Sequence, residues 1–204
     1  RGEAIYPTPV IGALGLMDDV TRNAPIAFGD EGDVVLLLGA TKSDGAPDSL
    51  SGSEYLEIVH DLVAGQPRID MELEIVVQRA CRRAVADGLV SSAHDCSDGG
   101  LAVAMAESCI AGEIGFSGSL EVSGRWDAVL FGEEQSRIVI SVPAANREAV
   151  EGICAEESAP VALLGEVGGE ALVIAGLLDV SVNQIADAWK GGLERAAEES
   201  ASTG

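Results

Sequence analysis

The stretch Ala93-His94-Asp95-Cys96-Ser97-Asp98-Gly99-Gly100-Leu101 decides how the centre of the chain folds. It follows a short apolar run and opens a long segment of apolar residues with helical spacing, so it predicts a turn from a strand into a buried helix. The turn brings together two carboxylates, a hydroxyl and the N–H groups of two glycines at a helix N-terminus. Such an end carries partial positive charge and open donors and therefore favours a phosphate, while a nearby carboxylate can hold the Mg²⁺ that accompanies it.

The same stretch has a purely structural interpretation. Ser97 and Asp98 are residue types that cap helices, and glycines allow a helix to approach a sheet closely. Ser-Asp-Gly-Gly is also a common turn composition. From these residues alone, both the phosphate site and the simple helix cap remain open.

Composition sets limits on the fold and the partners. The chain has 204 residues, of which 47% are hydrophobic and only 3% aromatic, so one sizeable core must be built from Val, Ile, Leu and Ala. The formal net charge is −22. This charge argues against a nucleic-acid partner, which requires Lys and Arg, and equally against an anionic membrane surface.

The excess of acidic residues suggests adaptation to high salt. Only Lys42 and Lys190 are lysines among 12 basic residues, against 34 acidic ones. We expect the melting temperature to rise along a KCl series, because salt screens the repulsion between surface carboxylates. A melting temperature that stays constant or falls with KCl would contradict this habitat hypothesis.

The chain has four cysteines, of which Cys81 and Cys109 fall within apolar helical patterns and are expected to be buried free thiols, although an even count also allows two disulfides. No pair has Cys-x-x-Cys spacing, which argues against a zinc site. A chain of this size does not need disulfides, so a reducing cytoplasm is the expected location. No apolar run reaches transmembrane length, and the first residue is Arg1, from which we expect a processed chain or a fragment of a longer one.

The remaining patterns alternate between strands and helices without a regular repeat of one unit. Residues 168–169 are both glycine and predict a hairpin turn between the two strands that flank them. The fold class is therefore α+β, a mixed β-sheet with flanking helices. The expected strands are 10–17, 33–39, 89–93, 115–122, 138–142, 161–167 and 171–175, and the expected helices are 54–63, 70–87, 99–112, 143–157 and 183–197.

Other candidate site residues have structural alternatives that we favour. His60 is expected to be a half-exposed helix residue and not a ligand. Arg79, Arg82 and Arg83 could grip an anion, but a solvated helix face that pairs with acidic residues explains them as well. Arg137 is expected to anchor an ion pair at the start of a strand.

Several motifs together resemble a known enzyme family. The segment from His94 to Leu101 is similar to the signature of the C-terminal domain that AIR synthase-related enzymes share. Three further stretches resemble the large subunits of phosphoribosylformylglycinamidine synthases, which act in purine biosynthesis. They are Tyr6-Pro7-Thr8-Pro9-Val10-Ile11-Gly12, Ser51-Gly52-Ser53-Glu54-Tyr55-Leu56 and Leu130-Phe131-Gly132-Glu133-Glu134-Gln135-Ser136-Arg137.

The resemblance implies a domain organisation and an activity. Residues 1–25 would be the end of a preceding, sheet-pairing domain, 26–197 an AIR synthase C-terminal-type domain with α/β/α layers, and 198–204 a flexible tail. The family reaction converts formylglycinamide ribonucleotide and ammonia to formylglycinamidine ribonucleotide with ATP. Its partners are a glutaminase subunit, a small bridging subunit and the upstream half of the same subunit; a homodimer is left open.

The resemblance also assigns roles to the central turn. It implies that Asp95 contacts Mg²⁺ and that Ser97, Asp98, Gly99 and Gly100 bind the phosphates of ATP or ADP. The family's catalytic residues lie upstream of Arg1, so no catalytic residue is expected in this chain, which would be inactive alone. Ser51 departs from the family's usual glycine, which puts the conformation of the loop before Ser53 in doubt.

Two alternatives remain beside this assignment. The chain could belong to another ATP-using relative of the superfamily, of the selenophosphate synthase, thiamine-monophosphate kinase or hydrogenase-maturation type. It could also be a non-catalytic module for packing and subunit contact, in which the central turn is only a helix cap.

Overall fold

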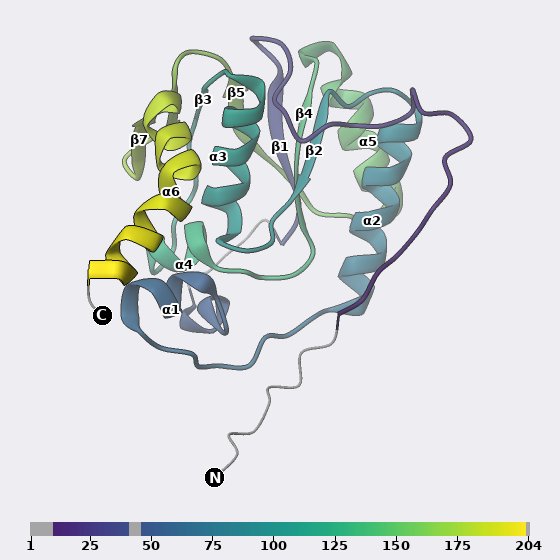
Figure 1. Ribbon diagram of the computed structural model, residues 1–204. Coiled ribbons are helices and arrows are strands. Elements are labelled where there is room, and N and C mark those ends of the chain that lie inside the picture. The colour runs from purple at the N-terminus through teal and green to yellow at the C-terminus, as the bar shows by residue number, and fades with distance from the viewer. Residues whose placement is uncertain (1–9, 41–45, 203–204) are drawn as a thin grey trace.

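The computed structural model describes residues 10–40 and 46–202, which form a seven-stranded mixed sheet with helices on both faces (Figure 1). The strands lie in the order β2-β4-β1-β5-β3-β6-β7, and within the described chain only β3 and β6 pair in parallel. The strands are β1 (Val34–Gly39), β2 (Ser92–Asp95), β3 (Phe116–Gly118), β4 (Arg137–Val142), β5 (Val161–Val167), β6 (Ala171–Ile174) and β7 (Leu178–Ser181). The helices are α1 (Glu54–His60), α2 (Met71–Ala86), α3 (Gly100–Gly112), α4 (Trp126–Phe131), α5 (Arg147–Glu157) and α6 (Val182–Ser202), with 3-10 turns η1 (Pro47–Leu50) and η2 (Ala144–Asn146).

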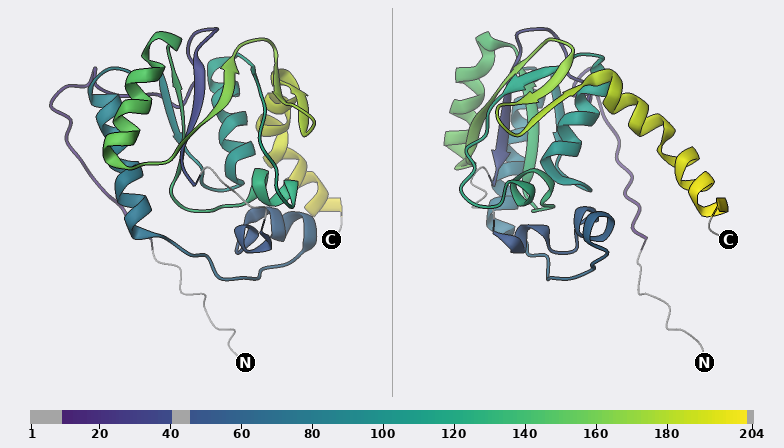
Figure 2. Two further views of the ribbon diagram at one scale, coloured as in Figure 1. Left: turned by 180° about the vertical axis from the view of Figure 1, so that it is seen from behind. Right: turned by 90° about the vertical axis from the view of Figure 1, so that its left-hand side faces the viewer.

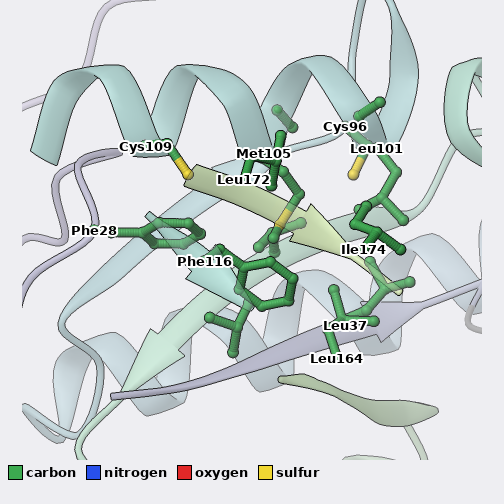
Figure 3. Packing of buried hydrophobic residues seen from close by; sticks show 14 of the residues in the cluster. Phe28, Leu37, Cys96, Leu101, Met105, Cys109, Phe116, Leu164, Leu172 and Ile174 are labelled. Atoms are coloured by element: carbon green, nitrogen blue, oxygen red, sulfur yellow. The ribbon is translucent and has the colours of Figure 1, made fainter. Parts of the chain in front are cut away.

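Strand β1 runs through the middle of the sheet and divides the core into two layers. All six of its residues are buried, as its continuous apolar run predicts, and it pairs antiparallel with β4 and β5. Successive side chains of a strand point to opposite faces. Leu36 and Leu38 therefore pack towards α2 and α5, whereas Val35 and Leu37 join the cluster under α3 that Figure 3 shows. Figure 2 shows α5 and α6 on opposite sides of the sheet, so the predicted α/β/α layering is confirmed.

Helix α3 is the buried helix that the sequence predicts behind the central turn. Leu101, Met105 and Cys109 are almost fully buried and contact Phe116 and the sheet within one cluster (Figure 3). A helix that is apolar on most sides needs cover on most sides, and α4 and α6 provide it. The helix therefore holds its N-terminus, and the turn before it, in a fixed place.

The predicted hairpin at residues 168–169 is wrong. Strands β5 and β6 are not neighbours, because β3 lies between them and pairs with both. Gly115 at the entry to β3 exchanges hydrogen bonds with the glycines of the turn, donating to Gly169 O at 2.8 Å and accepting from Gly168 N at 2.8 Å. Two glycines between two apolar runs are compatible with a hairpin, but also with a loop that connects two strands across a third strand lying between them.

The strand predicted over residues 10–17 is also not found. This segment forms no secondary structure in the described part of the chain, and the side chains of Val10 and Leu14 are 96% and 102% exposed. A strand requires a partner edge, and no strand of the described sheet pairs with this segment. The stretch from Tyr6 to Pro9 lies outside the described residues, and the division at residues 25 and 197 stays a prediction.

Several helix boundaries differ from the prediction. Helix α1 ends at His60 and not before Gly65, because Asp61 adopts the left-handed conformation that closes a helix. His60 itself lies exposed in the last turn, edge-on to Tyr55. Helix α6 continues to Ser202, five residues beyond the predicted end at Ala197, because the alanines and glutamates that follow Arg195 are strong helix formers. No helix in the described part of the chain is long and apolar enough to cross a membrane.

All four cysteines are buried free thiols, which confirms the prediction for Cys81 and Cys109. Burial disfavours the thiolate and raises the pKa of Cys109 to about 12 and that of Cys96 to about 11. Cys96 lies in the central turn, yet its raised pKa and its burial keep it a protonated packing residue and not a nucleophile.

Candidate functional site

The central turn lies at the end of an edge strand of the sheet. Strand β2 pairs only with β4 in the described chain, and its last residue, Asp95, stands opposite Ile138. The chain then leaves the sheet, and the N–H of Cys96 donates to the carbonyl oxygen of Arg137 at 3.0 Å. The side chain of Asp95 is 72% exposed. The sequence prediction of a carboxylate at a strand end, directly before a helix N-terminus, is therefore confirmed in its placement.

Two glycines give the turn its shape. Gly99 and Gly100 have φ angles of +77° and +67°, a region that residues with a side chain rarely adopt. A Cβ atom on Gly100 would lie 3.0 Å from the carbonyl oxygen of Leu130 and still closer to that of Gly132. The glycines thus allow the start of α3 to pack directly against the backbone that leaves α4.

Asp95 is held as a carboxylate by its neighbours. The hydroxyl of Ser97 donates to Asp95 Oδ2, and this hydrogen bond is the main reason why the pKa of Asp95 lies below its usual range, with a smaller contribution from His94. His94 Nε2 lies 2.9 Å from Glu107 Oε2 on α3. Its other ring nitrogen, Nδ1, lies 3.7 Å from Asp95 Oδ1. Ser97 and, to a smaller extent, His94 therefore favour the charged form of Asp95, and the hydrogen bond from Ser97 also orients its carboxylate.

Replacing Ser97 by alanine is expected to raise the pKa of Asp95 towards its usual value. The hydrogen bond favours the ionised carboxylate, so its stabilising effect is present above the unfolded-state pKa and is lost as the pH falls through the lower folded-state pKa. A carbon-detected NMR titration of the Asp95 carboxyl measures the change. Ser119→Ala, on an exposed serine elsewhere, is the control. An Asp95 pKa that is equal in the wild type and in Ser97→Ala would contradict this assignment.

The simple helix-cap interpretation does not describe this turn. The hydroxyl of Ser97 bonds to Asp95, and Gly99 occupies the N-cap position without a side-chain cap. The acceptor for the Gly99 N–H is instead Glu133, whose Oε1 lies 2.8 Å away. The same Oε1 accepts the N–H of Glu54, the first residue of α1, at 2.9 Å. The carboxylate of Glu133 thus joins the N-termini of α3 and α1.

Arg137 is an anchor, as predicted, but not through an ion pair. Its side chain is 3% exposed, and its guanidinium donates to the carbonyl oxygens of Val129 and Gly132 at the end of α4. Helix C-termini stabilise cations in this way. Nε of Arg137 is buried and has no hydrogen-bond partner among the described residues. A buried positive charge therefore lies next to the central turn.

A cleft of about 510 Å³ opens over these residues. Asp95, Ser97 and Asp98 line it from the turn, Glu133 lines it from the loop after α4, and Arg137 lines it from the first position of β4. A second cleft of about 510 Å³ shares Glu133 and other residues with the first. The first cleft has room for a phosphate, but the carboxylates among its described lining residues outnumber the single cation there. A phosphate would therefore need an accompanying metal ion to enter it.

The residues fit a magnesium ion only together with a ligand. No group of three or more His, Cys, Asp or Glu side chains in the described chain is arranged to hold a metal ion. Mg²⁺ keeps several waters and commonly takes one or two carboxylates together with substrate phosphates. Asp95, ionised and exposed at the mouth of the cleft, matches that requirement.

The family follows from comparison with known proteins. Residues 30–177 match the model of the AIR synthase related protein, C-terminal domain, which is more than half of the chain. The chain belongs to this family. The match begins before β1 and ends after β6, so the AIR synthase-related domain comprises the strands and helices that build the cleft.

Two curated relatives of the AIR synthase-related chain share a name. This chain is 43% identical over 204 residues to phosphoribosylformylglycinamidine synthase subunit PurL of Anaeromyxobacter sp. (strain K), covering 95% of this chain and 26% of the relative. It is 49% identical over 172 residues to the subunit of the same name of Synechococcus sp. (strain JA-2-3B'a(2-13)), covering 83% of this chain and 22% of that one. The chain thus spans about a quarter of the length of the relatives it matches.

A solved structure shares the fold. Thermotoga maritima PurL complexed with FGAR superposes with a TM-score of 0.67 at 20% identity, over 82% of this chain and 30% of that one. The same protein complexed with ATP gives a TM-score of 0.62 at 16% identity, over 82% and 28%. At this identity the likeness shows the fold of the AIR synthase-related domain and nothing about its ligands.

Glu133 belongs to the site although its sequence position does not predict it. Glu133 lies 34 residues from Gly99, and only the packing of α4 against α3 brings the two together. The one sequence signal that points to this region is the Gly-Glu-Glu-Gln-Ser-Arg segment, which resembles a family motif. The motif alone does not say what Glu133 does. The Arg79, Arg82 and Arg83 cluster lies on the exposed face of α2 away from the cleft, and Arg83 pairs with Glu156 at 2.6 Å, as the surface interpretation predicts.

Proposed function

We propose that this chain serves as the C-terminal part of a phosphoribosylformylglycinamidine synthase large subunit. That enzyme would convert formylglycinamide ribonucleotide and ammonia, released from glutamine, to formylglycinamidine ribonucleotide with ATP. The proposal rests on one observation, which is the identity with the Anaeromyxobacter relative along 95% of the chain. A single domain motif could be shared by many enzymes, whereas an identity of this level over almost the whole chain favours the same activity.

The cleft at the central turn is the part of this chain that would bind a nucleotide. Asp95 would hold Mg²⁺, and Ser97, Asp98, Gly99 and Gly100 would contact the phosphates of ATP or ADP. Mg²⁺ bound there would neutralise phosphate charge. The exposed, ionised carboxylate of Asp95 and the size of the cleft support this assignment.

The chain is proposed to act only within the complete enzyme, in the cytoplasm. The one thiol among the described residues that line the cleft, Cys96, is held protonated by burial. The partners would be the upstream half of the same subunit, a glutaminase subunit that supplies ammonia and a small bridging subunit. The isolated chain would bind nucleotide without turning it over.

A chimeric subunit tests this function. In the Anaeromyxobacter relative, the segment that matches this chain would be replaced by it, and formation of formylglycinamidine ribonucleotide would be assayed with ATP and an ammonium salt. We expect the chimera to retain activity within about tenfold of the parent, because this chain would supply the same fold and cleft. A chimera that folds and assembles but forms no product would contradict the proposal.

A further inference from the structure

Both glycine N–H groups of the proposed phosphate site already have acceptors: that of Gly100 donates to Ser97 O at 2.9 Å, within the turn, and that of Gly99 donates to the carboxylate of Glu133. Its Oε1 accepts the N–H of Gly99 at 2.8 Å and the N–H of Glu54 at 2.9 Å. A helix N-terminus stabilises a carboxylate for the same reason that it stabilises a phosphate, because both bring negative oxygen atoms to free N–H groups. The Gly99 N–H therefore cannot serve Glu133 and a ligand phosphate at the same time.

The surroundings of Glu133 favour an anion. Arg137, which lines the same cleft, is 3% exposed, and its Nε has no partner in the described chain. Its guanidinium bonds to the carbonyl of Gly132, the residue before Glu133. The N–H of Glu133 donates to Ser49 O at 3.1 Å. The backbone of Glu133 is thus held on both sides. If the carboxylate of Glu133 exchanges its hydrogen-bond donors, only the side chain has to move.

The second donor connects the site to another helix. Glu54 begins α1, and the side chain of Tyr55 stacks on Phe131 of α4 with ring centroids 4.8 Å apart. Glu133 therefore connects α1 to α3 through one oxygen atom. A group that takes the Gly99 N–H from Glu133 also weakens the tie to α1.

We propose that Glu133 is a displaceable carboxylate that competes with the ligand phosphate for the Gly99 N–H and so lowers the affinity of the cleft for nucleotide. The proposal rests on the proposed function, because it concerns the same nucleotide site. It makes Glu133 a residue that positions α1 and α3 and must release Gly99 when Mg-ADP binds. If Glu133 instead acted as a ligand of Mg²⁺, replacing it would weaken the binding of Mg-ADP.

Calorimetric titration of Mg-ADP into the chain and the variant Glu133→Gln distinguishes these roles. A glutamine can still accept the N–H groups, so the fold is retained, but it binds them more weakly than a carboxylate does. We expect Glu133→Gln to bind Mg-ADP roughly tenfold more tightly than the wild type. Glu134→Gln is the matched control, because Glu134 lies in the adjoining cleft and accepts a hydrogen bond from the Ser49 hydroxyl and not from α3. It removes the same charge and is expected to change the affinity by less than about twofold.

A second pair of variants removes the other donor. Glu54→Pro abolishes the α1 N–H that Glu133 accepts, and proline is well tolerated at the first position of a helix. The preceding Ser53 is extended, with φ −77° and ψ 150°, as a residue before proline requires. We expect Glu54→Pro to bind Mg-ADP about threefold more tightly than Glu54→Ala, because Glu133 then has one partner fewer to hold it at Gly99.

The outcomes separate the two proposals. If the wild type binds Mg-ADP and Glu133→Gln binds equally or more weakly, the competing role is wrong while the nucleotide site stands. If only Glu133→Gln binds, the competition is stronger than proposed and is confirmed. If neither the wild type nor any variant binds, both the competing role and the nucleotide site are overturned.

Discussion

Replacing Asp95 by alanine is expected to abolish the magnesium-dependent part of ADP binding, with a loss of affinity of about 100-fold or more. Asp95 is the exposed carboxylate at the end of β2 that would contact Mg²⁺ directly, and loss of residues that merely orient a metal ligand costs about 10–100-fold. Calorimetry with ADP in the presence and absence of MgCl₂ measures the effect. The melting temperature is expected to change little, because the side chain of Asp95 is 72% exposed.

Two further variants make the test of Asp95 specific. Asp95→Asn retains the shape and an acceptor for Ser97 but lacks the charge, and it is expected to lose affinity almost as strongly. Asp179→Ala removes the same charge from β7, at the opposite edge of the sheet, and is expected to bind Mg-ADP like the wild type. Mg-dependent binding that survives in Asp95→Ala would overturn the metal assignment.

Replacing Gly100 by alanine is expected to lower the free energy of unfolding by about 2–5 kcal/mol. An L-residue with a positive φ costs about 1–2 kcal/mol, and the new Cβ would press on the carbonyls of Leu130 and Gly132, for which overpacking adds about 1–3 kcal/mol. For a chain of this size the melting temperature would fall by roughly 5–20 °C. Thermal unfolding followed by circular dichroism measures it.

Gly88 provides the matched control for Gly100. Its φ is +69°, nearly the same as that of Gly100, but a Cβ atom at this position would have no described neighbour within 4 Å. Gly88→Ala should therefore cost only the conformational part, about 1–2 kcal/mol. Equal losses in the two variants would show that the start of α3 does not pack tightly against the backbone of residues 130–132.

The central strand and helix can be predicted from sequence because their signals are local. The apolar run at β1 is bounded by turn residues, and because no polar residue interrupts it, the sequence predicts burial on both faces. The same holds for α3, in which Glu107 is the one charged side chain. The position of Asp95 at a strand end follows directly from these signals, because it lies between a strand and a helix that both have clear patterns.

The order of the strands cannot be predicted in the same way. Strand β3 has only three residues, Phe116–Gly118, yet it enters between β5 and β6 and removes the hairpin that their proximity in sequence suggests. Pairing over this distance depends on how the glycines at both ends of the loop fit the backbone of β3. The alternation over residues 115–122 predicts that a strand is present, but it does not predict which strands lie beside it.

The sequence predicts the acidic and glycine residues of the candidate site but not what occupies its donors. Ser97 is expected to cap the helix or bind phosphate, and in the structure its hydroxyl holds Asp95. Glu133, which follows directly after the end of α4, contacts Gly99, 34 positions earlier in the chain. Such a contact follows from tertiary packing and not from local spacing, so only the folded chain reveals it.

The most direct test is an amide NMR titration of the chain with Mg-ADP. If the turn from Asp95 to Gly100 binds the magnesium–phosphate group, the amide signals of Ser97, Gly99 and Gly100 will shift in a saturable manner, and the signal of Glu54 will move with them as Glu133 releases it. The signal of Gly88, at the end of α2, will remain in place. Saturable shifts confined to other parts of the chain, or none at millimolar Mg-ADP, would contradict the account.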